Sequence, residues 1–200
     1  MEDLEHEGIM LRVPDDVYLP SDDSFLLAKH AKALSGRLLD VGCGSGIVAL
    51  TNAKANPDNE VLGIDINLSA VETSAKNAKL NNLRNTRFLQ SDLFHNLGNE
   101  AFDAIVFNPP YLPTSNGERL SGPINAAFDG GKNGRETVER FIQEFNPHLN
   151  PGGTLLLLHS SLNKPEKTTS ALRALGMETG VLEEISFFFE KLMVLKASKP

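Results

Sequence analysis

One motif, Asp40-Val41-Gly42-Cys43-Gly44-Ser45-Gly46, stands directly after the apolar pair Leu38-Leu39 and is the strongest local signal in the sequence. Glycines at alternate positions let the chain turn tightly from a strand into a helix and let a ligand lie against the backbone. The spacing is G-x-G-x-G rather than the G-x-G-x-x-G of dinucleotide sites. Such a turn is able to hold either a pyrophosphate or an amino-acid moiety.

On both sides of this motif, short apolar runs alternate with helical patterns, as is typical of a parallel sheet with crossover helices. Seven strands are expected, at Arg37–Val41, Glu60–Asp65, Thr86–Ser91, Asp103–Phe107, Thr154–His159, around Met177–Ser186 and at Lys191–Ala197. Helices are expected at Asn67–Leu80, Gly134–Leu149 and Lys164–Leu175. The last two strands are joined too closely for a crossover helix and should be antiparallel. The sequence predicts an α/β, Rossmann-like fold: a seven-stranded, mostly parallel sheet with a reversed last strand and helices on both faces.

Length and composition predict a single domain over residues 1–200. The formal net charge of −7 argues against a chain that binds a phosphate backbone unaided. Cys43 is the one cysteine, which excludes an intrachain disulfide and indicates a reducing compartment. The acidic start and the short apolar runs argue against a secreted or membrane-spanning protein, so a cytoplasmic one is expected. The five histidines show no metal-ligand spacing, and no metal site is expected.

Acidic residues lie at the ends of neighbouring predicted strands. Asp65 ends the second strand, where an acid accepts from both ribose hydroxyls in dinucleotide and S-adenosylmethionine sites alike. Asp92 follows the third strand, where a carboxylate is able to accept from an adenine amine. Together with Asp40, these acids disfavour a diphosphate and favour a ligand with a ribose, an ammonium and a sulfonium. We predict a nucleoside cofactor, with a dinucleotide-dependent oxidoreductase as the alternative.

The fourth predicted strand stops at Asn108-Pro109-Pro110-Tyr111, because two prolines remove backbone donors and fix φ. The oxygens of the Asn108 side chain and the Pro109 backbone are able to accept both hydrogens of a planar NH₂ group, and the Tyr111 ring offers a face for stacking. Such a nitrogen is a weak nucleophile because its lone pair is delocalised. Holding both hydrogens aims the lone pair at an electrophilic methyl without a strong base. Asn108, Pro109 and Tyr111 are therefore the predicted catalytic residues.

These motifs resemble the class I S-adenosylmethionine-dependent methyltransferases. Among them they are similar to the HemK-type enzymes, which methylate the glutamine side chain of the Gly-Gly-Gln motif in class I peptide release factors. The segment Tyr18-Leu19-Pro20-Ser21-Asp22-Asp23-Ser24-Phe25-Leu26-Leu27 is similar to the Tyr-x-Pro-x-Glu-Asp-Thr/Ser-Phe-Leu-Leu stretch of the eukaryotic and archaeal branch. Gly130-Gly131-Lys132-Asn133-Gly134-Arg135-Glu136 is a second shared stretch.

The resemblance implies S-adenosyl-L-methionine as the cofactor and glutamine N5-methylation as the activity. The glycine turn would hold the methionine part, Asp65 the ribose and Asp92 the adenine amine, and Tyr18 and Ser24 would close over them. The cofactor-binding residues expected are Tyr18, Ser24, Asp40, Gly42, Gly44, Gly46, Asp65, Ile66, Ser91, Asp92, Leu93 and Asn108. Residues 1–35 would cover the cofactor site. Residues 109–133, without convincing periodicity, are interpreted as a substrate-contacting lid, with a disordered insertion as the alternative.

The resemblance further implies a release factor as the substrate and a small zinc-binding activator subunit on the edge strand Thr86–Gln90. No membrane and no direct nucleic-acid partner are expected. Two other functions stay open: adenine N6-methylation of DNA or RNA, since adenine presents the same planar NH₂, and a non-catalytic methyltransferase-like subunit. Phe187-Phe188-Phe189 is expected to pack in the core or at a strand edge, with an interface as the alternative, and His159 to be a polar strand-end residue.

Overall fold

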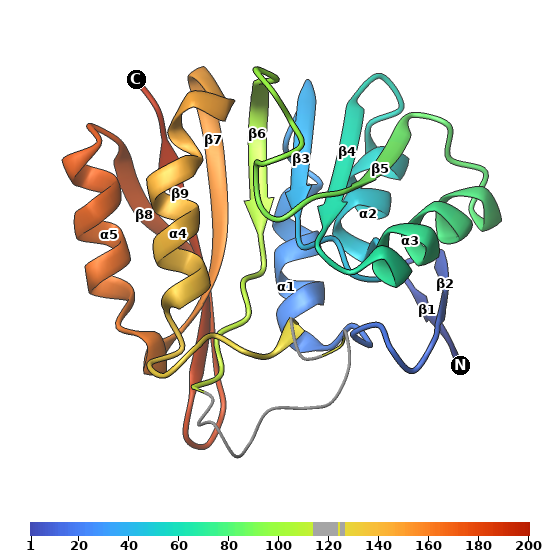
Figure 1. Cartoon of the computed structure of the whole chain (residues 1–200), viewed down its shortest axis with the longest axis horizontal. Helices are drawn as coiled ribbons and strands as arrows, with labels where there is room; N and C mark the ends of the chain where they lie inside the picture. Colours follow the sequence, from blue (N-terminus) through green and yellow to red (C-terminus); the bar gives the residue numbers. More distant parts are fainter. Residues whose placement is uncertain (114–123, 125–126) are drawn as a thin grey trace.

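The computed structural model describes residues 1–113, 124 and 127–200, and its main feature is a seven-stranded sheet (Figure 1). The strand order is β5-β4-β3-β6-β7-β9-β8. The strands are β3 (Arg37–Val41), β4 (Glu60–Asp65), β5 (Thr86–Gln90), β6 (Phe102–Phe107), β7 (Leu149–Ser160), β8 (Glu178–Ser186) and β9 (Lys191–Ser198). Neighbours from β5 to β7 pair in parallel, whereas β9 runs antiparallel to both β7 and β8. The predicted fold class, with its reversed last strand, is confirmed.

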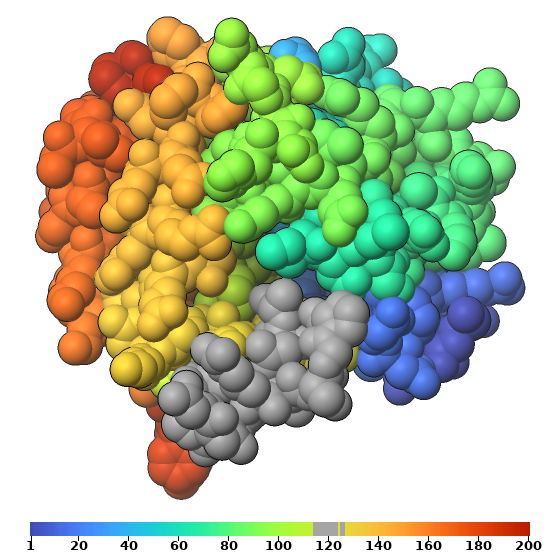
Figure 2. Space-filling model, in the orientation of Figure 1, coloured from blue at the N-terminus to red at the C-terminus, as the bar shows by residue number. Residues whose placement is uncertain are grey.

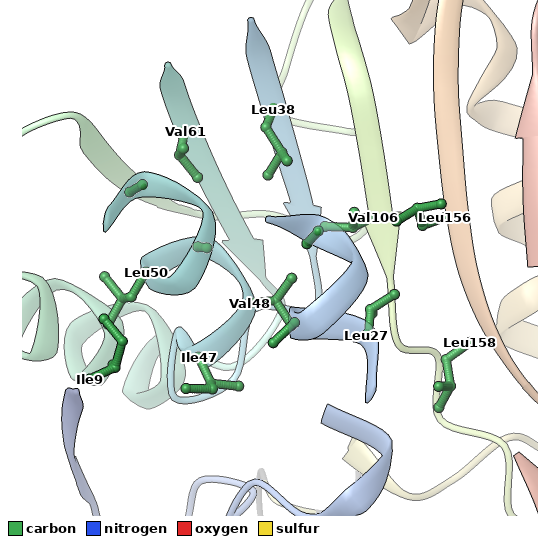
Figure 3. Close-up of a cluster of buried hydrophobic side chains, with 14 of the residues drawn as sticks. Ile9, Leu27, Leu38, Ile47, Val48, Leu50, Val61, Val106, Leu156 and Leu158 are labelled. Carbon is green, nitrogen blue, oxygen red and sulfur yellow. The ribbon is translucent and has the colours of Figure 1, made fainter. Parts of the chain in front are cut away.

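Helices cover both faces of this sheet (Figure 1). The helices are α1 (Asp22–Ala31), α2 (Ile47–Ala55), α3 (Leu68–Leu80), α4 (Glu136–Glu144) and α5 (Pro165–Ala174), with short 3₁₀ turns at η2 (Asn146–His148) and η3 (Ser161–Asn163). Successive strand residues point to opposite faces, so that Leu38 packs with α1 and α2 whereas Leu39 packs with α4. Figure 3 shows the first of these two cores, where Val48 of α2 lies on the side toward the strands and Leu50 points the other way, toward Ile9.

The predicted helix over 134–149 is wrong at its C-terminal end. Helix α4 ends at Glu144, residues Asn146–His148 form the 3₁₀ turn η2, and strand β7 begins at Leu149. The cause is Pro147, because proline lacks an N–H for the helical ladder and disfavours helical backbone in the residue before it. Strand β7 therefore starts earlier than the predicted Thr154.

The sequence analysis assigned no element before Arg37, but three elements lie there. Strands β1 (Glu2–His6) and β2 (Ile9–Val13) form an antiparallel hairpin, and α1 follows. Glu7 and Gly8 join the strands with φ of 48° and 76°, the left-handed pair that a two-residue hairpin turn requires. Alternate β2 side chains are buried in the core with Leu50 of α2.

The expected core packing of Phe187, Phe188 and Phe189 is wrong. These residues form the turn between β8 and β9, and the tip of this hairpin protrudes from the body (Figures 1 and 2). Phe188 is 92% exposed and Phe189 is 84% exposed. The turn is closed by the Phe187 N–H, which donates to the Glu190 carbonyl at 2.7 Å. The rings therefore lie beyond the ends of β8 and β9, where these strands do not cover them.

None of the described helices has the length and hydropathy of a membrane-spanning segment.

Candidate active site

The carboxyl ends of β3, β4 and β6 open into one cavity of about 530 Å³. This edge is where open parallel sheets bind ligands. All the predicted site residues except Gly46 line the cavity: Tyr18, Ser24, Asp40, Gly42, Gly44, Asp65, Ile66, Ser91, Asp92, Leu93, Asn108, Pro109 and Tyr111. Gly46 lies behind the wall, at the N-terminus of α2. Of the predicted lid over 109–133, residues 114–123 and 125–126 lie outside the described residues.

The glycine turn is built from backbone that only glycine adopts readily. Gly42, Gly44 and Gly46 have φ of 66°, 54° and 90°. At Gly46 an added Cβ would lie 3.0 Å from Ser74 Oγ, while at Gly44 it would meet nothing within 4 Å. Ser74 Oγ also donates to the Gly44 carbonyl at 2.9 Å. The turn is thus anchored on α3 and leaves open space above Gly44, against the cavity, where a ligand fits.

Asp40 is a buried acid that serves the helix behind the turn. Its side chain is 2% exposed, and Oδ2 accepts from the Ala49 N–H at 3.1 Å, one of the donors that the first turn of a helix leaves unpaired. Burial raises the pKa of Asp40 to about 8, against the Ala49 hydrogen bond, which lowers it. Asp40 therefore caps the first turn of α2 in addition to lining the cavity.

Asp65 lies at the tip of β4 with both carboxylate oxygens turned to backbone donors. Oδ2 accepts from the Gly44 N–H and Oδ1 from the Asn67 N–H, each at 2.9 Å. Each oxygen has a further lone pair, so a ligand diol is still able to donate to both. Burial raises the pKa of Asp65, and these backbone hydrogen bonds oppose that rise. The side chain is therefore fixed in place before any ligand arrives.

Asp92 has a partner that the sequence did not reveal. Arg140 of α4 donates from Nη2 to Asp92 Oδ2 at 2.9 Å, and both side chains are roughly half exposed. The backbone beside it is held by Ser91, whose Oγ donates to the Leu93 carbonyl at 2.7 Å and accepts from the Asn96 N–H. One Asp92 oxygen is thus occupied, and the other carries the acceptor capacity expected for an adenine amine.

The Asn-Pro-Pro-Tyr turn follows β6 as predicted, and its amide has one filled side and one empty side. Asn108 Nδ2 donates to Asp23 Oδ2 at 3.1 Å. Asn108 Oδ1 is buried and has no hydrogen-bond partner among the described residues. The Tyr111 carbonyl accepts from Asn163 Nδ2 at 2.7 Å, which ties the turn to η3. Burial, and then the nearby charge of Asp23, raise the pKa of Tyr111, so the ring faces the cavity as a neutral phenol.

Asp23 lies at the site but is not among the predicted site residues. It lines the cavity, is 3% exposed, and accepts from the Tyr18 hydroxyl at 3.1 Å as well as from Asn108. The available signal was an acid in the first turn of a helix whose later residues Leu26 and Leu27 are apolar. Burial, and then the charge of Asp23, raise the pKa of Tyr18 to about 12.

Two other titratable side chains, Cys43 and His159, are buried. Cys43 is buried beside Ser74, and burial raises its pKa well above the usual range, whereas a nucleophilic thiol needs a lowered pKa. His159 is the penultimate residue of β7, the strand-end position that was predicted; it is buried, and burial lowers its pKa to about 4. Within the described part of the chain, no group of three or more His, Cys, Asp or Glu is placed to hold a metal ion.

Comparison with known proteins bears on these features. Residues 21–120 match the family model described as "Methyltransferase small domain". A Methanocaldococcus jannaschii protein named "Putative protein N5-glutamine methyltransferase" is 42% identical over 97% of this chain and 98% of its own length. Methyltransferase HEMK2 of Homo sapiens is 33% identical over 92% of this chain and 90% of its own.

A solved structure has a similar fold. The E. cuniculi Mtq2-Trm112 complex, described as responsible for methylation of the eRF1 translation termination factor, contains a chain that superposes with a TM-score of 0.71. That match has 28% sequence identity and covers 92% of this chain and 99% of the other. The chain described here belongs to the methyltransferase small domain family and to the protein N5-glutamine methyltransferases.

Proposed function

We propose that this chain transfers a methyl group from S-adenosyl-L-methionine to the side-chain amide nitrogen of the glutamine in the Gly-Gly-Gln motif of a class I release factor. One observation carries the proposal: a buried amide oxygen, Asn108 Oδ1, has no partner among the described residues and belongs to a residue that lines the cavity. Buried acceptors are nearly always satisfied. A substrate NH₂ group is the kind of donor that this oxygen lacks.

The cofactor suits other residues that line the same cavity. The open space above Gly44 accommodates the methionine part, Asp65 offers two acceptors to a ribose diol, and Asp92 retains an oxygen for an adenine amine. When bound, the cofactor supplies a methyl group on a sulfonium sulfur, whose positive charge is favoured near acids. Four further residues line the same cavity, and we assign them to the cofactor subsite: Ser24, Ile66, Ser91 and Leu93.

The chain's own contribution to the reaction is positioning. Asn108 Oδ1 and the Pro109 carbonyl accept the two hydrogens of the target amide, and Tyr111 stacks on its plane, so the nitrogen lone pair points along the line of transfer. The bound cofactor would supply the methyl group, its S–C bond breaking as the N–C bond forms, and Asn108 Oδ1 and the Pro109 carbonyl would stabilise the positive charge on the target nitrogen. The extra proton then leaves to solvent. No base is needed before the attack.

A partner subunit on the β5 edge is the second part of the proposal. The sheet has two edges, β5 and β8. Strand β8 carries a register shift between Val181 and Glu183 and two exposed acids, Glu178 and Glu184, devices that discourage pairing. Strand β5 is short and regular, with Phe88 and Leu89 only partly buried. The complex of Mtq2 with Trm112 supports a small partner for this family; we propose that a zinc-binding activator pairs with Thr86–Gln90.

The test is methylation of a purified class I release factor, with and without a zinc-binding activator subunit, read by mass spectrometry of the Gly-Gly-Gln peptide. We expect one added methyl on the glutamine with the wild-type chain and none with Asn108→Ala. Added activator should protect β5 amides, and not β8 amides, from hydrogen exchange. A release factor left unmodified by a chain that binds the cofactor would refute the proposed substrate, and methylation of adenine instead would establish the alternative, adenine N6-methylation of DNA or RNA.

Because release factors act in translation, we propose that the activity is cytoplasmic.

A further inference from the structure

The Asp23 carboxylate is the centre of a buried hydrogen-bond network. Besides Asn108 Nδ2, its donors are the Tyr18 hydroxyl at 3.1 Å, Ser21 Oγ at 2.9 Å, and the N–H and hydroxyl of Ser24 at 2.6 and 3.0 Å. Asp23 lies in the first turn of α1, whose inner face is buried in the core. The carboxylate is therefore held both by its helix and by donors on several sides.

This network determines which way the Asn108 amide faces. A carboxylate only accepts hydrogen bonds, whereas an amide has one donor end and one acceptor end. Asn108 must therefore turn Nδ2 toward Asp23, at 3.1 Å, and its oxygen away from it. The oxygen then lies buried without a partner among the described residues, an arrangement that is unfavourable unless something imposes it.

We propose that Asp23 is a positioning residue that locks the Asn108 amide with its oxygen toward the target NH₂ group. The inference deepens the proposed function and rests on it. With the amide rotated by half a turn, Asn108 would present its own NH₂ to the target NH₂, two donors facing each other, and the substrate would lose an acceptor. Asp23 does not touch the reacting atoms. It acts through Asn108.

The network also links this acceptor to the N-terminal segment. The same carboxylate holds Tyr18 and Ser24, two residues predicted to lie against the cofactor. Asp23 and Asn108 are 85 positions apart in the sequence, on α1 and at the end of β6. The orientation of the substrate-binding amide thus depends on the N-terminal segment being in its place.

The test uses Asp23→Asn, which keeps the size of the side chain but replaces one acceptor by a donor. Its matched control is Asp22→Asn, which removes a charge from the neighbouring, exposed position of the same helix turn. In the release-factor assay we expect kcat to fall roughly 10²- to 10³-fold for Asp23→Asn, as for a lost catalytic hydrogen bond. Both variants are assayed at saturating S-adenosyl-L-methionine, because Asp23 also holds Tyr18 and Ser24 and its replacement is expected to weaken cofactor binding as well. Wild-type kcat in Asp23→Asn at saturating cofactor would overturn the inference.

A spectroscopic readout makes the result independent of the substrate. In ¹⁵N-labelled protein saturated with S-adenosylhomocysteine, the side-chain NH₂ resonance of Asn108, assigned by its loss in Asn108→Ala, should shift in Asp23→Asn and stay in place in Asp22→Asn. A resonance that does not respond to Asp23→Asn would refute the locking contact. If the wild-type chain methylates no release factor, the proposed function fails, while the resonance still decides whether Asp23 orients Asn108.

Discussion

Replacing Asp65 by alanine tests the cofactor subsite at its most definite point. Both Asp65 oxygens are already fixed by backbone N–H groups of Gly44 and Asn67, each at 2.9 Å. A bound ribose would add one hydroxyl donor to each oxygen. A hydrogen bond to a charged group contributes about 1.5–3 kcal/mol, so Asp65→Ala should weaken binding by about 3–6 kcal/mol. This corresponds to a roughly 10²- to 10⁴-fold higher dissociation constant.

Isothermal titration with S-adenosylhomocysteine measures this effect directly. The matched control is Asp58→Ala, an exposed aspartate just before the other end of β4, which should bind as the wild type does. Asp65→Asn, which keeps an acceptor but loses the charge, should fall between the wild type and alanine. A folded Asp65→Ala protein that binds within about threefold of wild type would refute the assignment of Asp65 to the ribose.

The pH dependence of the same affinity gives a second check. The charged carboxylate is the form that accepts from the ribose, so protonation of Asp65 should weaken binding as the pH falls. Burial raises the pKa of Asp65 above that of an ordinary aspartate, so the weakening should begin at a higher pH than an exposed aspartate would cause. Asp65→Asn should lack this dependence. Equal pH profiles in wild type and Asp65→Asn would show that another group titrates.

Three other changes have definite expected outcomes. Asn108→Ala should abolish methyl transfer and leave cofactor affinity, measured by the same titration, within about threefold; an equal loss of binding would contradict its role toward the substrate. The buried His159, with its pKa lowered from 6.5 to about 4, should cost the protein up to about 3 kcal/mol of stability as the pH falls from 6.5 to 4, because the unfolded chain takes up the proton first; His159→Leu should flatten that part of the urea-unfolding profile. Phe141→Ala, which removes a ring 4.8 Å from that of Phe107, should lower the free energy of unfolding by about 3–5 kcal/mol, whereas Phe188→Ala at the exposed tip should change it by less than about 0.5 kcal/mol.

The sequence sufficed where local chemistry decides the structure. Alternating glycines after an apolar strand, and the prolines after Asn108, restrict the backbone by themselves, so the turns at the ends of β3 and β6 are where they were predicted. Parallel strands share a carboxyl edge, which is why the sequence pattern predicts Asp65 near the glycine turn, where its Oδ2 accepts from the Gly44 N–H.

Contacts between distant segments were not predictable from local patterns. Asp92 with Arg140, and Asp23 with Asn108, are pairs that only the packing of helices against the sheet brings together. The predicted burial of Phe187–Phe189 is wrong for a related reason. Three consecutive apolar residues indicate burial on average, but the tight turn leaves Phe188 and Phe189 exposed, in edge-to-face contact with each other.

The side chain of Asn77 joins the start of the chain to the glycine turn. Its Oδ1 accepts from the Arg12 N–H and its Nδ2 donates to the Ser45 carbonyl, both at 2.9 Å, while Asn81, one helical turn on, makes a matching pair of hydrogen bonds to the Met10 backbone. The edge of β2 that is not paired with β1 is thus held by amide side chains of α3 and of its C-cap rather than by a second strand. Any ligand that stiffens the glycine turn should also slow the hydrogen exchange of the Arg12 amide, a probe outside the cavity that reports its occupancy.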